Sequence, residues 1–105
     1  MGQDLMQIKV CSVDMVPLDS IKQFYLGDLE VLIVNLGGHF FSLEGRCTHA
    51  GAPLGEGTMT GEVLTCPWHG SQFQITDGEV IKGPAEKQLT TYPTDVRGNA
   101  VFIEL

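Results

Sequence analysis

The sequence predicts an all-β protein, with short strands arranged in small antiparallel sheets. Segments rich in β-branched and aromatic residues recur along the chain, and several alternate apolar with polar side chains, which is the period of two typical of a half-buried strand. In the C-terminal segment, for example, Val101, Ile103 and Leu105 share one face. No segment sustains a period of 3.6 residues, and thirteen glycines oppose long helices. With 105 residues and no repeat or linker, residues 1–105 are expected to form one domain.

The expected strands follow one another at short intervals. Gly, Asp and Asn at residues 37–38, 77–78 and 98–99 indicate hairpin turns, because these residue types tolerate a positive φ. The segment 21–26 follows Asp19-Ser20, and a short helical turn is its alternative. The strands are expected at residues 6–13, 21–26, 29–36, 40–43, 62–65, 71–75, 87–95 and 100–105.

Two segments, residues 44–61 and 66–70, resist assignment as strands. The first has five glycines spaced through it, and the second ends on Gly70. Long irregular loops in a compact β domain are usually functional. The candidate site is therefore expected in these two segments.

Each of the two loops carries one cysteine and one histidine. The first contains Cys47-Thr48-His49 and the second Cys66-Pro67-Trp68-His69, with sixteen residues between His49 and Cys66. Side chains at i and i+2 of an extended backbone point to the same side, so the first pair can face one centre. A tight turn, in which Pro67 fixes φ, does the same for the second pair. The sequence therefore predicts one centre with two thiolates and two imidazoles.

Two metal chemistries match this donor set. In one, a [2Fe–2S] cluster has one iron held by two Cys and the other by two His. In the other, a single structural zinc ion takes all four ligands. Zinc sites generally pair Cys with Cys and His with His along the chain, whereas here each loop has Cys followed by His. This order favours the two-iron centre, and structural zinc is the alternative.

The loops resemble the two signature boxes of Rieske [2Fe–2S] proteins. The matching residues are Cys47-Thr48-His49-Ala50-Gly51 and Cys66-Pro67-Trp68-His69-Gly70-Ser71-Gln72-Phe73, and Gly83-Pro84-Ala85 stands where the family has a proline loop. The resemblance implies a Rieske iron–sulfur domain of three small antiparallel sheets with two cluster-binding loops at one tip. It also implies that Cys47, His49, Cys66 and His69 bind one cluster, with the cysteines buried and the histidines partly exposed.

Three positions depart from the pattern of the Rieske subunits of respiratory and photosynthetic complexes. Ala52 and Trp68 stand where those subunits have two further cysteines that form a disulfide, so no such bridge can form here. Phe73 replaces a Tyr that donates a hydrogen bond to a cysteine sulfur. Because hydrogen bonds to sulfur raise the reduction potential, the chain is expected to have a low potential. The pattern resembles the soluble Rieske ferredoxins of bacterial aromatic-ring dioxygenase systems.

A [2Fe–2S] centre moves one electron at a time, so an enzyme would need a second site. His39 is the only histidine left after the four ligands are assigned, which is too few for a mononuclear iron site with two His. We therefore expect an electron carrier rather than an enzyme. It would take electrons from a flavin-containing ferredoxin reductase and deliver them to a terminal oxygenase. The alternative is a Rieske-like small subunit of a nitrite reductase or another multicomponent redox enzyme, although such subunits commonly lack the ligands.

Composition restricts the partners and the compartment. Thirteen acidic and six basic side chains give a net charge of −7, which argues against nucleic acid and anionic membranes and suits basic protein partners. No stretch approaches the roughly 18 apolar residues of a membrane span, and Met1-Gly2-Gln3-Asp4 lacks the basic start of a signal peptide. Three cysteines leave no second pair beside the two ligands, so a disulfide framework is not expected. A monomer in the reducing cytoplasm is the expectation.

Other conspicuous side chains are expected to have ordinary structural roles. Cys11 lies within a strand and should be a buried small side chain. His39 follows a Gly-Gly turn and should be exposed. Trp68 lies between two ligands, and packing is expected rather than a role in electron transfer. By the family pattern, Pro53 and Leu54 should shield the cluster from water.

Overall fold

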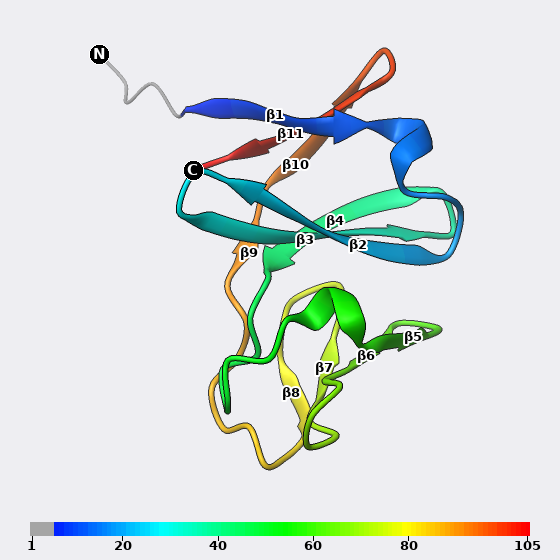
Figure 1. Cartoon of the computed structure of the whole chain (residues 1–105). Helices are drawn as coiled ribbons and strands as arrows, with labels where there is room; N and C mark the ends of the chain where they lie inside the picture. Colours follow the sequence, from blue (N-terminus) through cyan, green and yellow to red (C-terminus); the bar gives the residue numbers. More distant parts are fainter. Residues whose placement is uncertain (1–5) are drawn as a thin grey trace.

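The computed structural model describes residues 6–105, which form a β protein with two single-turn 3-10 helices (Figure 1). The N-terminal tetrapeptide in which no signal was found lies outside the described residues. The strands are β1 (Gln7–Ser12), β2 (Ser20–Leu26), β3 (Leu29–Leu36), β4 (His39–Glu44), β5 (Thr58–Thr60), β6 (Val63–Thr65), β7 (Gln72–Gln74), β8 (Val80–Lys82), β9 (Thr91–Tyr92), β10 (Thr94–Arg97) and β11 (Ala100–Glu104). The 3-10 helices are η1 (Val13–Met15) and η2 (Leu54–Glu56).

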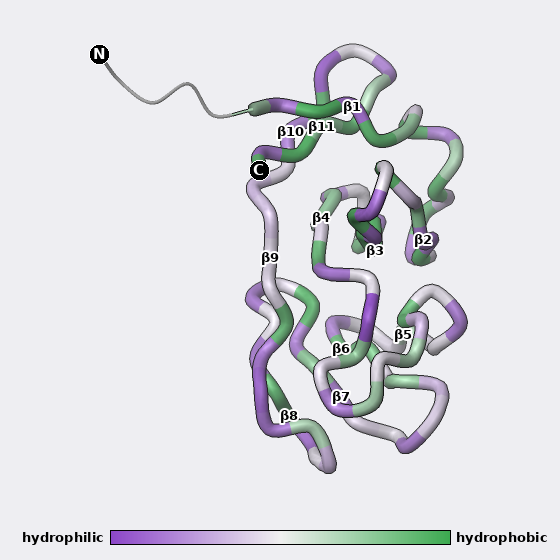
Figure 2. Tube along the Cα trace, turned by 60° about the vertical axis from the view of Figure 1, so that its left-hand side comes forward, coloured by the Kyte–Doolittle hydropathy of each residue, from purple (hydrophilic) through white to green (hydrophobic). Residues whose placement is uncertain are grey.

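The strands form three antiparallel sheets, as expected. Their strand orders are β1-β11-β10, β2-β3-β4-β9 and β5-β6-β7-β8. The first two sheets form the upper part of the molecule in Figure 1, and the third lies below them with the long loops. Figure 2 shows the same separation from another side, with β1, β10 and β11 at one end and β7 and β8 at the other. No helix within residues 6–105 is both long and apolar enough to cross a membrane.

The central strand β3 connects two hydrophobic cores. Val31 and Ile33 belong to the core between the first two sheets, while Leu32 and Val34 belong to the core shared with the third sheet. This division follows from the alternation of side chains along a strand. All four are fully buried, so β3 fixes the ligand-bearing half of the molecule on the other half. The second core also contains Cys47 and Cys66.

Most expected strands are present, the segment 21–26 among them, and two differences have physical reasons. The segment 21–26 forms β2, paired with β3 along its whole length rather than forming a helical turn. The expected strand 87–95 is instead two short strands separated by Pro93, which has no N–H to donate to a ladder. Residues 87–90 lie outside these strands, and Lys87 and Leu89 bond instead to Thr48 and Gly78. The short strands β5 and β8 were not expected, because three residues carry too little periodicity.

Candidate metal centre

The first ligand loop, residues 45–53, leaves the end of β4 and folds back on itself. The Cys47 N–H donates to the Ala52 carbonyl at 2.9 Å, and the Gly51 N–H donates to the Cys47 carbonyl at 2.8 Å. Gly51 has φ +72°, a conformation that glycine adopts without strain. Arg46 and Pro53 form an isolated antiparallel bridge that closes the base of the loop.

The second ligand loop, residues 66–71, joins β6 to β7 in a matching way. The Cys66 N–H donates to the Ser71 carbonyl at 2.8 Å, again five residues along the chain. Gly70 has φ +76° and occupies the same place in this loop as Gly51 does in the first. Each loop therefore holds its cysteine at the closed base and projects its histidine outward.

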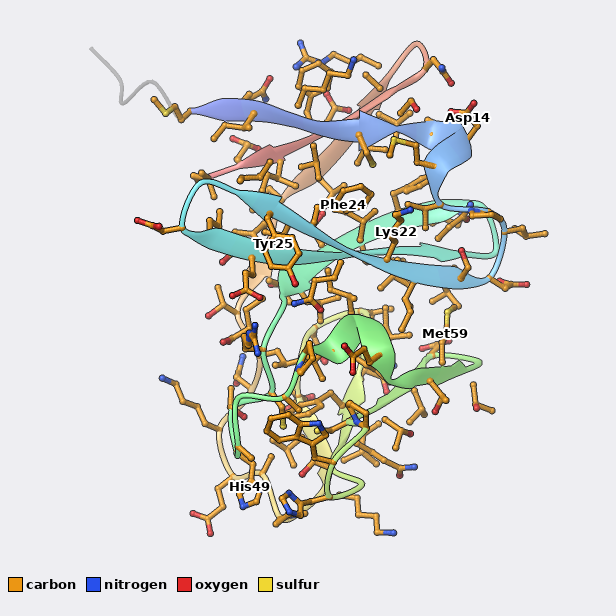
Figure 3. All side chains as sticks on the ribbon, viewed as in Figure 1. Asp14, Lys22, Phe24, Tyr25, His49 and Met59 are labelled. Atoms are coloured by element: carbon orange, nitrogen blue, oxygen red, sulfur yellow. The ribbon has the colours of Figure 1, made fainter. Side chains whose placement is uncertain are left out.

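The four candidate ligands separate by residue type. Cys47 and Cys66 are each only 3% exposed and belong to the same core. His49 and His69 are exposed, and their ring centroids lie 5.2 Å apart in an edge-to-face arrangement. Figure 3 shows His49 at the end of the molecule away from the first sheet. The structure thus places two thiols side by side inside and two imidazoles side by side at the tip.

The surroundings of Cys47 are those of a sulfur ligand. Burial raises the pKa of the Cys47 thiol, and the neighbouring Cys66 thiol raises it further. The backbone N–H groups of His49 and Ala50 bond to the sulfur and act in the opposite direction, lowering that pKa. Metal binding requires thiolates, so these N–H groups stabilise the form of Cys47 that binds metal. Metal loading of the free protein should accordingly release protons.

This donor set fits two irons better than one metal ion. Within the part of the chain that the structure describes, no three His, Cys, Asp or Glu side chains gather at the spacing of a single ion. A two-iron centre does not need such a group, because each iron takes only two protein ligands. The paired thiols match the ligands of one iron, and the paired imidazoles match those of the other.

A third segment, residues 83–88, covers the two ligand loops and is called the covering segment below. The Thr48 hydroxyl donates to the Lys87 carbonyl at 2.5 Å. The Ala85 N–H donates to the Ser71 hydroxyl oxygen at 2.9 Å, and both residues are buried. These two bonds attach the covering segment to both loops. The expectation for Gly83-Pro84-Ala85 located this segment, but the role of Thr48 could not be read from the sequence.

An apolar cluster lies beneath the loops and includes the fully buried Leu54, while Pro53 is only partly buried. Its side chains are fully buried and come from four different segments: Leu54, Leu64, Phe73, Ile75 and Leu89.

Cys11 is buried in the other core, and His39 is exposed at the start of β4, both as expected. The expectation for Trp68 was wrong, because its side chain is 55% exposed. Trp68 lies with Pro67 between the buried Cys66 and the exposed His69, in the part of the loop that projects into solvent.

Sequence reasoning missed a polar network that ties the first loop to β2 and β3. The Arg46 Nε donates to Glu30 Oε1 at 2.9 Å, and its Nη1 donates to the Gly51 carbonyl at 2.9 Å. The Gln23 amide donates to Glu30 Oε1 at 3.0 Å and accepts a bond from the Gly55 N–H at 2.7 Å. Arg46 is about half exposed, so its ion pair adds little to stability. Its bond to Gly51 instead orients the loop between Cys47 and Ala52.

Replacing Gln23 by alanine should destabilise the protein. The half-buried Gly55 N–H would lose its acceptor, and an unsatisfied buried donor costs about 1–3 kcal/mol. Urea denaturation should show this decrease in the free energy of unfolding. The control is Gln88→Ala, an exposed glutamine, which should change it by less than about 0.5 kcal/mol. Equal effects of the two replacements would contradict the structural role of Gln23.

Comparison with known proteins agrees with this geometry. Residues 6–93 match the family model described as the Rieske [2Fe-2S] domain. The 3-phenylpropionate/cinnamic acid dioxygenase ferredoxin subunit of Escherichia coli K12 is 36% identical over 76 residues, which are 71% of this chain and 72% of the relative. The subunit of the same name from Shigella boydii has the same identity and coverage.

Solved structures of ferredoxins have the same fold. The ferredoxin of Sphingomonas yanoikuyae B1 superposes with a TM-score of 0.89 at 27% identity, covering 95% of this chain and 99% of its own. A chain from the complex of reduced oxygenase and oxidized ferredoxin in carbazole 1,9a-dioxygenase superposes with a TM-score of 0.86 at 28% identity. In that comparison, 93% of this chain and 92% of the other are covered.

Proposed function

Because the chain belongs to the Rieske [2Fe–2S] domain family, we propose that it is a ferredoxin that carries single electrons to the terminal oxygenase of a dioxygenase system. Relatives at 36% identity are named as ferredoxin subunits of a dioxygenase, and a structural neighbour comes from an oxygenase–ferredoxin complex. These names favour a ferredoxin over a nitrite reductase subunit. Its role is therefore electron transfer rather than catalysis.

The single observation that carries this proposal is the separation of the donor set. Cys47 and Cys66 would hold one iron of a [2Fe–2S] cluster, and His49 and His69 would hold the other. When bound, the cluster supplies reversible storage of one electron. Because the cysteines are buried, the iron that they would hold is kept from water. Because the imidazoles are exposed, the iron that they would hold lies within reach of a partner. Electrons therefore enter and leave at the tip.

We further propose a flavin-containing ferredoxin reductase as the electron donor, and the reducing cytoplasm as the location. All three cysteines are free thiols, and each is buried, which suits a reducing compartment. The experiment that tests the function is electron delivery in a mixture of reductase, this protein and oxygenase. Oxygenase turnover that depends on this protein supports the proposal, while turnover that is the same without it contradicts the proposal.

The reduction potential should lie in the low part of the Rieske range, which spans about −150 to +300 mV. Phe73 is fully buried in the core that contains both cysteines, and its side chain has no donor for a sulfur. Replacing Phe73 by tyrosine should raise the potential by tens of millivolts, on the order of one hydrogen bond. A redox titration measures both values. Phe102→Tyr, on the first sheet, is the control and should leave the potential unchanged.

A further inference from the structure

Glu30, near the start of β3, bonds to the first ligand loop through both its side chain and its backbone. Its Oε1 accepts bonds from Arg46 Nε at 2.9 Å and from the Gln23 amide at 3.0 Å. Its backbone carbonyl accepts a bond from the Gly45 N–H at 2.9 Å. A Cβ atom at Gly45 would lie only 3.1 Å from this carbonyl oxygen, so glycine permits the close approach. The base of the loop is therefore held against β3.

Arg46 extends this attachment to the backbone turn around the Cys47 sulfur. Its Nη1 donates to the Gly51 carbonyl at 2.9 Å, and the Gly51 N–H donates to the Cys47 carbonyl at 2.8 Å. The N–H groups of His49 and Ala50, which bond to the Cys47 sulfur, lie between these two points in the chain. The guanidinium thus spans the turn that presents the sulfur.

The guanidinium also brings a permanent positive charge to this turn. A fixed positive charge stabilises the reduced cluster, which carries one more negative charge, and so raises its reduction potential. The carboxylate of Glu30 opposes this effect from 2.9 Å. The Glu30 side chain is 25% exposed, against 45% for Arg46, so water screens the negative charge less than the positive one. Glu30 therefore cancels the electrostatic effect of the residue that holds the loop.

We propose that Arg46 is a positioning residue for the first ligand loop and that Glu30 neutralises its charge, so that the loop is held without raising the reduction potential. The proposal rests on the proposed function, because it concerns the potential at which a bound cluster exchanges electrons. A lower potential makes the reduced protein a stronger electron donor, since the free energy of transfer is proportional to the potential difference. Neither residue is a predicted ligand, and neither belongs to the core around the cysteines.

The charge of Glu30 can be removed without removing its contacts. Within residues 6–105, both side-chain bonds of Glu30 end on one oxygen, Oε1. The amide oxygen of glutamine can accept the same two bonds, so Glu30→Gln changes the charge alone. Glu44, directly before the loop, accepts a bond from the Thr90 N–H, and its charge is the same in every variant.

A redox titration of the cluster-loaded protein, followed by visible absorbance, tests the proposal. Glu30→Gln should raise the midpoint potential and change the ratio of oxidised to reduced protein about three-fold at a fixed potential, which is about 28 mV at 59 mV per tenfold change for one electron. This is the size expected for one partly screened charge. Arg46→Gln should lower the midpoint potential. Arg46→Lys keeps the charge and should lower it less.

A second ion pair of the chain provides matched controls. Arg97 Nε lies 3.4 Å from Asp95 Oδ2, on β10 of the first sheet, at the end of the molecule away from the ligands. Asp95→Asn changes the net charge from −7 to −6, as Glu30→Gln does, and Arg97→Gln changes it to −8, as Arg46→Gln does. The two controls should change the ratio by less than about 1.3-fold, because the molecule is 40 Å long and charges are screened over about 10 Å at 0.1 M salt.

A Glu30→Gln shift no larger than that of Asp95→Asn, or a shift to lower potential, would overturn the proposal. A rise of the potential in Arg46→Gln would overturn it as well. Loss of the cluster from Arg46→Gln would support the positioning role, and the titration of Glu30→Gln then decides the role of the charge. An unchanged protein without a visible cluster spectrum would instead contradict the proposed function, so the two failures are distinguishable.

Discussion

Replacing Cys66 by alanine should abolish cluster binding. Cys66 is buried beside Cys47 at the base of its loop, and no other cysteine lies in the core that contains the two. A metal ligand lost from a buried site cannot be replaced by water without burying water among apolar side chains. The purified variant should lack the visible absorption of the cluster and contain no stoichiometric iron or acid-labile sulfide.

The same variant should also be less stable than the loaded protein, because metal binding contributes to the free energy of folding. Thermal unfolding followed by circular dichroism measures this loss. Cys11→Ala is the matched control, since Cys11 is equally buried but lies in the other core. It should keep the full visible spectrum. A coloured Cys66→Ala protein with unchanged iron content would show that Cys66 is not a ligand.

Replacing Gly57 by alanine should destabilise the second ligand loop. A Cβ atom at this position would overlap the carbonyl oxygen of Thr65, the residue before Cys66, and would also crowd Pro67. The backbone at Gly57 has φ −82°, which any residue adopts, so the effect is steric rather than conformational. Because the obstacle is backbone, it cannot rotate away, and overpacking of this kind costs about 3 kcal/mol. This is a large share of a typical stability of about 5–15 kcal/mol.

Urea denaturation of the metal-free and loaded proteins measures this cost. Gly83→Ala is the control, because the nearest atoms to its Cβ belong to Ala85 at 3.7 Å or more. We expect less than about 0.5 kcal/mol for the control. We also expect the Gly57 variant to lose its cluster faster, since Thr65 and Cys66 would have to shift. A Gly57→Ala protein as stable as the control would mean that the close approach of Gly57 to Thr65 is wrong.

The sequence predicted most of the larger sheets because their strands are long enough to show alternation. β3 has eight residues and β2 has seven, and both were expected within one residue of their observed bounds. The strands β5 and β8 have three residues each, and their pairing depends on partners far away in the chain. Residues 87–90 were expected in a strand, but the Lys87 carbonyl accepts a hydrogen bond from Thr48 and the Leu89 N–H donates to Gly78 instead.

Local spacing was likewise enough to bring each cysteine and its histidine into one loop. It could not show how the loops are held, because those contacts are long-range. Arg46 reaches Glu30 sixteen residues away, and Gln23 reaches Gly55 thirty-two residues away. Neither pair leaves a pattern in the sequence. The exposure of Trp68 was missed for a related reason, since it follows from the way the second loop closes rather than from the residue type.

The central claim is that two thiolates and two imidazoles of this chain hold one [2Fe–2S] cluster. The most direct measurement is electron paramagnetic resonance of the reduced protein, labelled with ¹⁵N only in histidine, which detects the coupling of the electron spin to the histidine nitrogens. We expect couplings from two histidine nitrogens, and equal amounts of iron and sulfide in the protein. In each of the variants His49→Ala and His69→Ala, if it retains a cluster, one of the two couplings should be lost. A colourless protein that contains zinc, or a cluster spectrum without histidine couplings, would contradict it.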